Sequence, residues 1–159
     1  MLKQYYQRGI TLLELMFSLV IVLMVLVVAA RYYETVRTAH RVNEAVSMVH
    51  VIYTASEGWL QNNLDLSEAS MQNFVNNNSV PNNFVTSNNV NPWGGDIKIA
   101  IDKSKPMVIN ITMSNVPLND CRNLLQKLRQ KMTDVIPSVS AGGSCENNAF
   151  AVPLDFSAK

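Results

Sequence analysis

The pattern of apolar and polar positions divides the chain into an apolar first part and a polar remainder. Between Ile10 and Ala30 the only charged residue is Glu14. The only other polar side chains in this stretch are those of Thr11 and Ser18. About 20 apolar residues are enough for a helix to cross a bilayer. The sequence therefore predicts a membrane-spanning helix near the start of the chain.

Beyond Ala30 the pattern changes to that of an amphipathic helix. Apolar residues recur at spacings of three and four, while charged residues occupy the other faces. These apolar positions are Tyr33, Val36, Ala39, Val42, Val46, Val49 and Tyr53. No proline or glycine occurs from Ile10 to Glu57, so one continuous helix is predicted from about residue 10 to about residue 60. We expect its second half to pack on a globular domain and its first half to stand free of that domain.

The region that follows the long helix is crowded with Asn and Ser. In residues 61–96 these side chains favour turns and loops. A short helix is expected from Ser67 to Val75, with Ser67 or Asp65 as its cap. The segment from Asn91 to Gly95 reads Asn-Pro-Trp-Gly-Gly and predicts a turn that leads into a strand.

The C-terminal part is predicted to hold a small sheet and a second helix. Polar and apolar residues alternate over 96–101 and 107–113, which predicts a β-hairpin. Residues 115–120 are typical of a helix entry, and an apolar stripe at helical spacing follows them. The stripe consists of Cys121, Leu124, Leu125, Leu128 and Met132. A Gly- and Ser-rich loop at 138–144 and a final strand at 148–156 complete an α+β prediction in which the second helix covers one face of the sheet.

Charges and cysteines indicate how the chain is oriented. Lys3 and Arg8 precede the apolar run and no acidic residue does, so the positive-inside rule keeps residues 1–9 in the cytoplasm and sends the rest outward. Outside the cytoplasm a pair such as Cys121 and Cys145 most simply forms a disulfide, whereas in the cytoplasm it would be two thiols. The expected bridge would tie the second helix to the terminal strand.

The small residue next to the apolar run lies on an unusual side of it. An ordinary secretory signal has its small-residue cleavage site after the apolar stretch, but here Gly9 comes before it. The run Arg8-Gly9-Ile10-Thr11-Leu12-Leu13-Glu14-Leu15-Met16 resembles the prepilin signature of type IV pilins and of type II secretion pseudopilins. The resemblance implies that a membrane peptidase cuts between Gly9 and Ile10 on the cytoplasmic side and methylates the new amine of Ile10. Family members more often begin with Phe or Met at this position.

The same resemblance implies an architecture. It divides the chain into a leader peptide (1–9), a transmembrane and filament-core segment (10–30) and a globular domain (31–159) that includes the second half of the long helix. In the pilin fold that helix, from about residue 10 to about residue 60, packs on a small antiparallel sheet with a second C-terminal helix and a disulfide-bounded region. The helix within the disulfide-bounded region and the Asn-Pro-Trp-Gly-Gly segment are similar to those of the type IVb branch, although a nine-residue leader is short for that branch.

Glu14 is the residue that the membrane prediction leaves hardest to explain. An ionised carboxylate in hydrocarbon costs several kcal/mol, and such a group usually has a functional partner. In related filaments this glutamate is thought to pair with the terminal amine of a neighbouring subunit, which here is the amine of Ile10. The alternative is that Glu14 lies close enough to the membrane interface to stay hydrated.

Composition and motifs argue against several classes of function. The formal charge is only +1, with Lys and Arg scattered along the chain, so no direct nucleic-acid partner is predicted. No nucleophile elbow, phosphate loop, paired carboxylates or metal-ligand cluster is found, so we predict no enzyme activity, cofactor or metal site. His40 and His50 have no second histidine at the i+4 spacing and are read as surface or packing residues.

The resemblance implies a structural subunit of a type IV pilus. Its partners would be further copies of itself in a helical homopolymer, the prepilin peptidase, the pilus assembly machinery and, before assembly, the inner membrane. The final location would be extracellular, and such filaments serve adhesion, aggregation, motility, DNA uptake or conjugation. A minor pilin or a pseudopilin is the alternative. Major pseudopilins tend to lack a C-terminal disulfide and to carry an acidic calcium-binding loop, whereas only Glu146 and Asp155 stand near this C-terminus.

Overall fold

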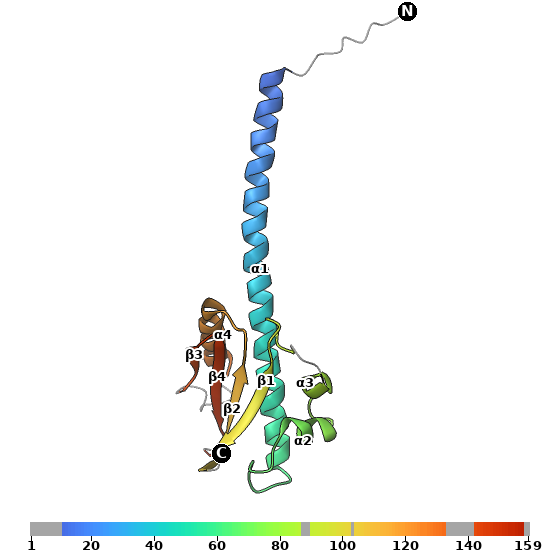
Figure 1. The fold of residues 1–159 in the computed structure, drawn as a ribbon, viewed down its shortest axis with the longest axis vertical. Helices are drawn as coiled ribbons and strands as arrows, with labels where there is room; N and C mark the ends of the chain where they lie inside the picture. The colour runs from blue at the N-terminus through green and yellow to red at the C-terminus, as the bar shows by residue number, and fades with distance from the viewer. Residues whose placement is uncertain (1–10, 87–89, 103, 133–141, 158–159) are drawn as a thin grey trace, which may run out of the picture. The chain divides into compact units, whose positions relative to one another are not determined.

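The computed structural model describes residues 11–86, 90–102, 104–132 and 142–157. Contacts divide the chain into two units, residues 1–38 and residues 39–159. The described elements, drawn in Figure 1, are α1 (Leu12–Leu60), α2 (Met71–Asn76), α3 (Asn83–Thr86), β1 (Ile97–Asp102), β2 (Lys105–Met113), α4 (Leu118–Met132), β3 (Ser144–Glu146) and β4 (Ala149–Asp155). This arrangement is α+β, as the sequence predicts.

The predicted long helix is confirmed as α1, which ends at Leu60. In the first unit every described residue from Thr11 to Arg37 is exposed. In the second unit the predicted apolar stripe is buried at Val42, Val46, Val49 and Tyr53. Tyr33 and Val36 belong to the same stripe but remain exposed. The amphipathic pattern therefore begins before the part of the helix that is covered by the rest of the chain.

The sheet has four antiparallel strands in the order β1-β2-β4-β3. The predicted hairpin is confirmed as β1 and β2, whose register places Ile97 opposite Met113. The predicted final strand is β4, which lies between β2 and β3. β3 was not predicted, because three residues with the sequence Ser-Cys-Glu carry no alternating pattern. Of the loop expected at 138–144, residues 138–141 lie outside the described residues and Ser144 belongs to β3.

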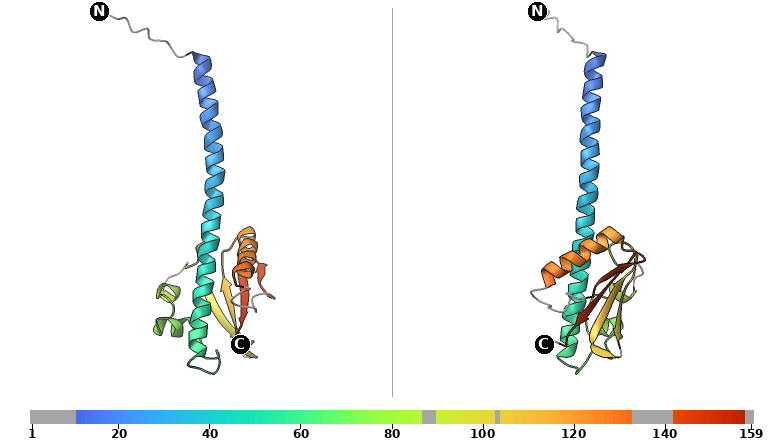
Figure 2. Two further views of the ribbon diagram at one scale, coloured as in Figure 1. Left: turned by 180° about the vertical axis from the view of Figure 1, so that it is seen from behind. Right: turned by 90° about the vertical axis from the view of Figure 1, so that its left-hand side faces the viewer.

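One hydrophobic core joins the sheet, the second half of α1 and α4. On β2 and β4 alternate residues are fully buried, and they are Ile109, Ile111, Met113, Phe150, Val152 and Leu154. The α4 stripe is buried at Cys121, Leu124 and Leu128 and joins the same cluster. Lys127 of α4 donates a hydrogen bond to Asn43 of α1 over 2.9 Å, and Figure 2 shows the two helices side by side. As expected, the second helix is thus held against the core of the sheet.

The end of β4 is also fixed to α1. Tyr53 and Phe156 stack with ring centroids 5.2 Å apart, and Phe156 donates its backbone N–H to the carbonyl of Met107 over 2.9 Å. The Tyr53 hydroxyl in turn donates to the carboxylate of Glu57 over 2.7 Å. These contacts place the C-terminal strand and the last turns of α1 in the same core.

The helix expected at Ser67–Val75 is shorter and starts later than predicted. α2 begins at Met71, and its cap is Ser70, whose hydroxyl accepts the N–H of Asn73. Neither Ser67 nor Asp65 caps it, because the Asp65 carboxylate accepts the N–H and hydroxyl of Ser67 and folds the chain into a turn. Burial of Leu66, which is 0% exposed, and of Ala69 then fixes where α2 can begin. The four-residue helix α3 was also expected to be loop.

Gly95 lies in the turn before β1 at a point of close backbone approach. A Cβ built on Gly95 would overlap the carbonyl of Ser114, the residue that follows β2. Gly58, in α1, has no heavy atom within 4 Å of such a Cβ. The two glycines therefore differ in whether a methyl group can be accommodated.

Gly95→Ala should lower the free energy of unfolding by about 1–3 kcal/mol, because the methyl group forces the turn away from Ser114. Gly58→Ala is the control and should leave stability unchanged or raise it by about 0.5–1 kcal/mol, since alanine is the better helix former. Urea unfolding of the full chain in detergent micelles, followed by tryptophan fluorescence, measures both. Equal effects of the two substitutions would contradict the close approach.

Candidate functional site

The first unit presents an apolar helix surface that no described residue covers. Large hydrophobic side chains from Leu12 to Val28 are exposed on all faces, from 49% at Val20 to 78% at Leu12. By length and composition α1 is able to cross a membrane. A surface of this kind needs lipid or other protein around it, because apolar area exposed to water is unfavourable.

Thr11 and Glu14 form the start of this helix. The N–H of Glu14 lies 3.0 Å from the carbonyl of Thr11 and 3.4 Å from its hydroxyl, so Thr11 has the place and contacts of an N-cap. Sequence analysis missed this role, although Thr followed three residues later by Glu is the pattern of a capping box. Acidic side chains in a first turn are favoured by the helix dipole.

The Glu14 carboxylate has no hydrogen-bond or ion-pair partner among the described residues. Glu14 is exposed, as is the whole first turn of α1. The expected cleavage and methylation positions, Gly9 and Ile10, lie outside the described residues. The structure therefore leaves Glu14 available for a partner, and the roles of Gly9, Ile10 and Glu14 remain predictions.

The predicted disulfide between Cys121 and Cys145 is present. The two Cα atoms are 6.0 Å apart and the residues are separated by 24 positions in the chain. Cys121 lies on the buried face of α4, but Cys145 lies on β3 and not on the terminal strand β4 as expected. The prediction missed this because β3 itself had no recognisable pattern. The bridge thus joins α4 to the edge strand of the sheet, and the segment between them is closed into a loop.

The Asn91–Gly95 turn is a polar network inside the second unit. The Asn91 side chain, 3% exposed, accepts the N–H groups of Trp93 (3.0 Å) and Gly95 (2.9 Å). It also donates to the carbonyl of Ser114 over 2.7 Å. One amide thus joins the turn to the end of β2 and satisfies polar groups that water cannot reach.

Trp93 extends the same network to α4. Its indole Nε1 donates to Oδ2 of Asp120 over 2.7 Å. Asp120 stands in the first turn of α4, directly before the disulfide residue Cys121. Sequence analysis predicted the turn but not these partners, because bonds that join residues 27 positions apart leave no local pattern.

Two carboxylates of the second unit have a lowered pKa because a neighbouring serine donates hydrogen bonds to each of them. The hydroxyl of Ser67, and secondarily its N–H, lower the pKa of Asp65. Ser157 lowers the pKa of Asp155 in the same two ways, and Lys105 adds a smaller attraction. A lowered folded-state pKa stabilises the fold above the normal value of 3.8, and this contribution is lost as the pH falls through the folded-state pKa. Their contribution to stability is therefore fully present at neutral pH and is lost only under acid conditions.

The two histidines, read from the sequence as surface or packing residues, are both exposed. His40 Nδ1 lies 3.9 Å from the carboxylate of Glu44, with the His40 side chain 80% exposed. His50 is also exposed. Within the described part of the chain, no group of three or more His, Cys, Asp and Glu side chains is arranged to hold a metal ion.

Removing the disulfide through Cys121→Ser together with Cys145→Ser should lower the free energy of unfolding by roughly 3 kcal/mol, because a loop of this length is no longer closed in the unfolded chain. Urea unfolding of the full chain measures the loss. Adding reductant is the matched control, since it should destabilise the wild type to a similar extent and leave the double variant unchanged. Identical unfolding curves for both proteins without reductant would contradict the prediction.

Comparison with known proteins agrees with both halves of this description. A family model described as the N-terminal part of PilS matches residues 32–153, and the prokaryotic N-terminal methylation motif matches residues 5–30. No curated protein and no solved structure matches the chain. Both models point to a structural protein rather than an enzyme. The PilS match covers more than half of the chain and the methylation motif covers its start, so the chain belongs to the type IV pilins.

Proposed function

We propose that this chain is a structural subunit of a type IV pilus, anchored in the inner membrane before assembly and then packed into an extracellular filament. The observation that carries the proposal is the apolar half of α1, exposed on all sides from Leu12 to Val28. Lipid can cover this surface in the precursor, and the same segments of other copies can cover it in a filament. Both environments remove it from water without any change in the helix.

The start of the chain would be processed before assembly. A prepilin peptidase would cut between Gly9 and Ile10 and methylate the new amine of Ile10, as the methylation motif over residues 5–30 suggests. Residues 1–9 would stay in the cytoplasm with Lys3 and Arg8, and residues 31–159 would face the periplasm. An oxidising periplasm would also suit the bridge between Cys121 and Cys145.

Glu14 would guide the docking of one subunit on the next. Its carboxylate is exposed in the first turn of α1 and has no partner among the described residues. A positive amine at Ile10 of a neighbouring subunit would neutralise it, which relieves two charges that are both costly in an apolar filament core. Because the surrounding residues are apolar, this pair would also select one axial register.

A minor pilin or a pseudopilin of a secretion machine is the second candidate. It would share the anchor, the processing and the helix, so these features do not separate the classes. The disulfide between α4 and β3 favours the pilin, since major pseudopilins tend to lack one. Abundance in the filament separates a major subunit from a minor one.

The first test is the intact mass and N-terminal sequence of the protein recovered from material sheared off the native cells. A major pilin should begin at methylated Ile10, carry an oxidised cysteine pair and dominate the sheared fraction. Processing at Gly9 with retention in the cell envelope would favour a minor pilin or pseudopilin. An uncut N-terminus would overturn the proposal.

Glu14→Gln should leave membrane insertion and cleavage intact and reduce the filament yield by at least about tenfold, because one buried amine per contact loses its counter-charge. Glu34→Gln is the matched control, since Glu34 is an exposed acid on the same helix beyond the apolar run. The yield is measured by immunoblotting of sheared and membrane fractions. Normal filaments from the Glu14 variant would exclude the charge pair while leaving the pilin assignment open.

A further inference from the structure

The outer edge of β1 carries backbone groups that have no partner in the described structure. Ser114 donates its N–H to the carbonyl of Asp96 over 3.1 Å, which marks these two residues as a hydrogen-bonded pair. Hydrogen-bonded pairs recur at every second residue of an antiparallel ladder. The groups of Lys98 and Ala100 therefore face β2, whereas those of Ile97, Ile99 and Ile101 point to the free edge. Among the described residues, none forms a hydrogen bond with the backbone N–H or carbonyl of these three isoleucines.

The opposite side of β2 supports this assignment. Phe156 donates its N–H to the carbonyl of Met107, so odd-numbered residues of β2 bond to β4 and even-numbered residues bond to β1. Since β1 is the first strand in the order β1-β2-β4-β3, no strand among the described elements lies beyond it. The edge is thus a regular row of donors and acceptors.

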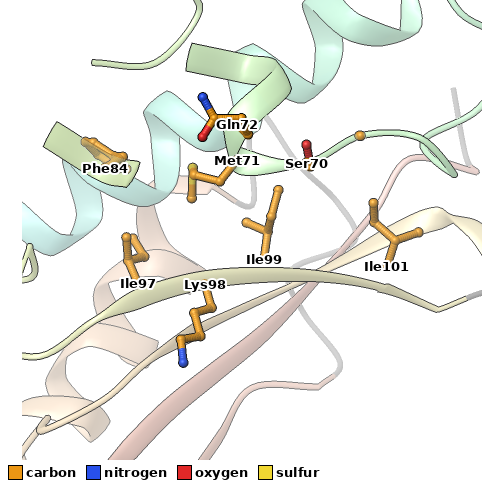
Figure 3. A pocket seen from close by; sticks show the side chains of 9 residues that line it. Ser70, Met71, Gln72, Phe84, Ile97, Lys98, Ile99 and Ile101 are labelled. Carbon is orange, nitrogen blue, oxygen red and sulfur yellow. The ribbon is translucent and has the colours of Figure 1, made fainter. Parts of the chain in front are cut away.

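A largely apolar groove of about 360 Å³ lies between β1 and the residues of α2 and α3. Figure 3 shows the side chains of Ile97, Ile99 and Ile101 rising from one face of β1, with Ile97 and Ile99 directed toward Met71 and Phe84. Lys98 extends from the other face of the strand. Ile99 and Ile101 remain half-buried, in contrast to the fully buried isoleucines of β2. The volume is within the range of sites that bind ligands, about 300–1,000 Å³.

The backbone edge and the groove specify one shape of occupant. An extended peptide added to β1 would bond to the free groups of Ile97, Ile99 and Ile101. Because side chains alternate along a strand, every second residue of this peptide would enter the groove and must be apolar. Its other residues would lie beside Lys98, which is exposed and has no acidic partner among the described residues. A carboxylate at that position gives charge complementarity.

We propose that the free edge of β1 is a docking site for an extended segment of another protein, with apolar residues at alternate positions and an acidic residue opposite Lys98. A second copy of this chain fits less well, because its own β1 would bring another Lys98, a like charge, to the face that carries Lys98. The other edge of its sheet is β3, a strand of three residues whose central Cys145 is held in the disulfide and offers no apolar side chain to the groove. The proposal does not depend on filament assembly, since the edge and groove belong to the second unit alone.

The test uses the full chain in detergent micelles and a labelled, capped peptide in which valine alternates with threonine and one glutamate. Fluorescence anisotropy measures binding, and amide hydrogen exchange locates it. We expect binding to slow exchange at Ile97, Ile99 and Ile101. Ile99→Pro should weaken binding by about tenfold, because it removes an outward N–H that the β1-β2 ladder does not use.

Charge variants keep the test independent of any folding defect in the proline variant. Lys98→Glu should weaken binding of the glutamate peptide by about threefold and strengthen binding of a lysine version by a similar factor. Lys131→Glu, an exposed substitution on α4, is the matched control and should change neither. Absence of binding, or binding without protection of the three amides, would overturn the proposal. Protection that appears without peptide as the protein concentration rises would also overturn it, because a second copy would then occupy the edge.

Discussion

Helix α1 has to meet two different requirements along one continuous stretch of backbone. Its second half contributes Val42, Val49 and Ile52 to a core in which these side chains are at most 1% exposed. Its first half has no such partner, and every described residue as far as Arg37 is exposed. All backbone groups within a helix are bonded internally, so the same helix is compatible with a membrane, a filament core or a globular domain. Which of these surrounds each half depends only on the side chains.

The globular unit depends on α1 as one side of its core. The sheet buries only one of its faces, and a small sheet of this kind needs a helix packed against that face to be stable. Tyr53 and Phe156 stack across this contact, and Lys127 fixes α4 to Asn43 of the same helix. If the sheet and α4 no longer packed on α1, the globular domain would therefore lose its fold as well as its fixed attachment to the anchor helix.

A buried hydrogen-bond network and a disulfide stabilise the polar C-terminal region, where the apolar pattern is weak. The Asn91 side chain joins the turn before β1 to the end of β2, and Trp93 continues the connection to Asp120 of α4. The bridge from Cys121 to Cys145 then holds α4 to β3. The bridge thus fixes the β3 edge of the sheet, while the other edge, β1, stays without a neighbouring strand in the described structure. That asymmetry leaves β1 open to an additional strand.

The sequence by itself determined those features that rest on local periodicity and composition. These are the length of α1, the hairpin, α4, the last strand and the anchor motif around Gly9 and Glu14, because side chains three, four or two positions apart share a face. The pairing of Cys121 with Cys145 followed from their number and compartment. Only the tertiary structure decided the start of α2, the existence of β3, the partners of Asn91 and Asp120, and the groove beside Ile99. Each depends on contacts between residues distant in the chain, which no local pattern encodes.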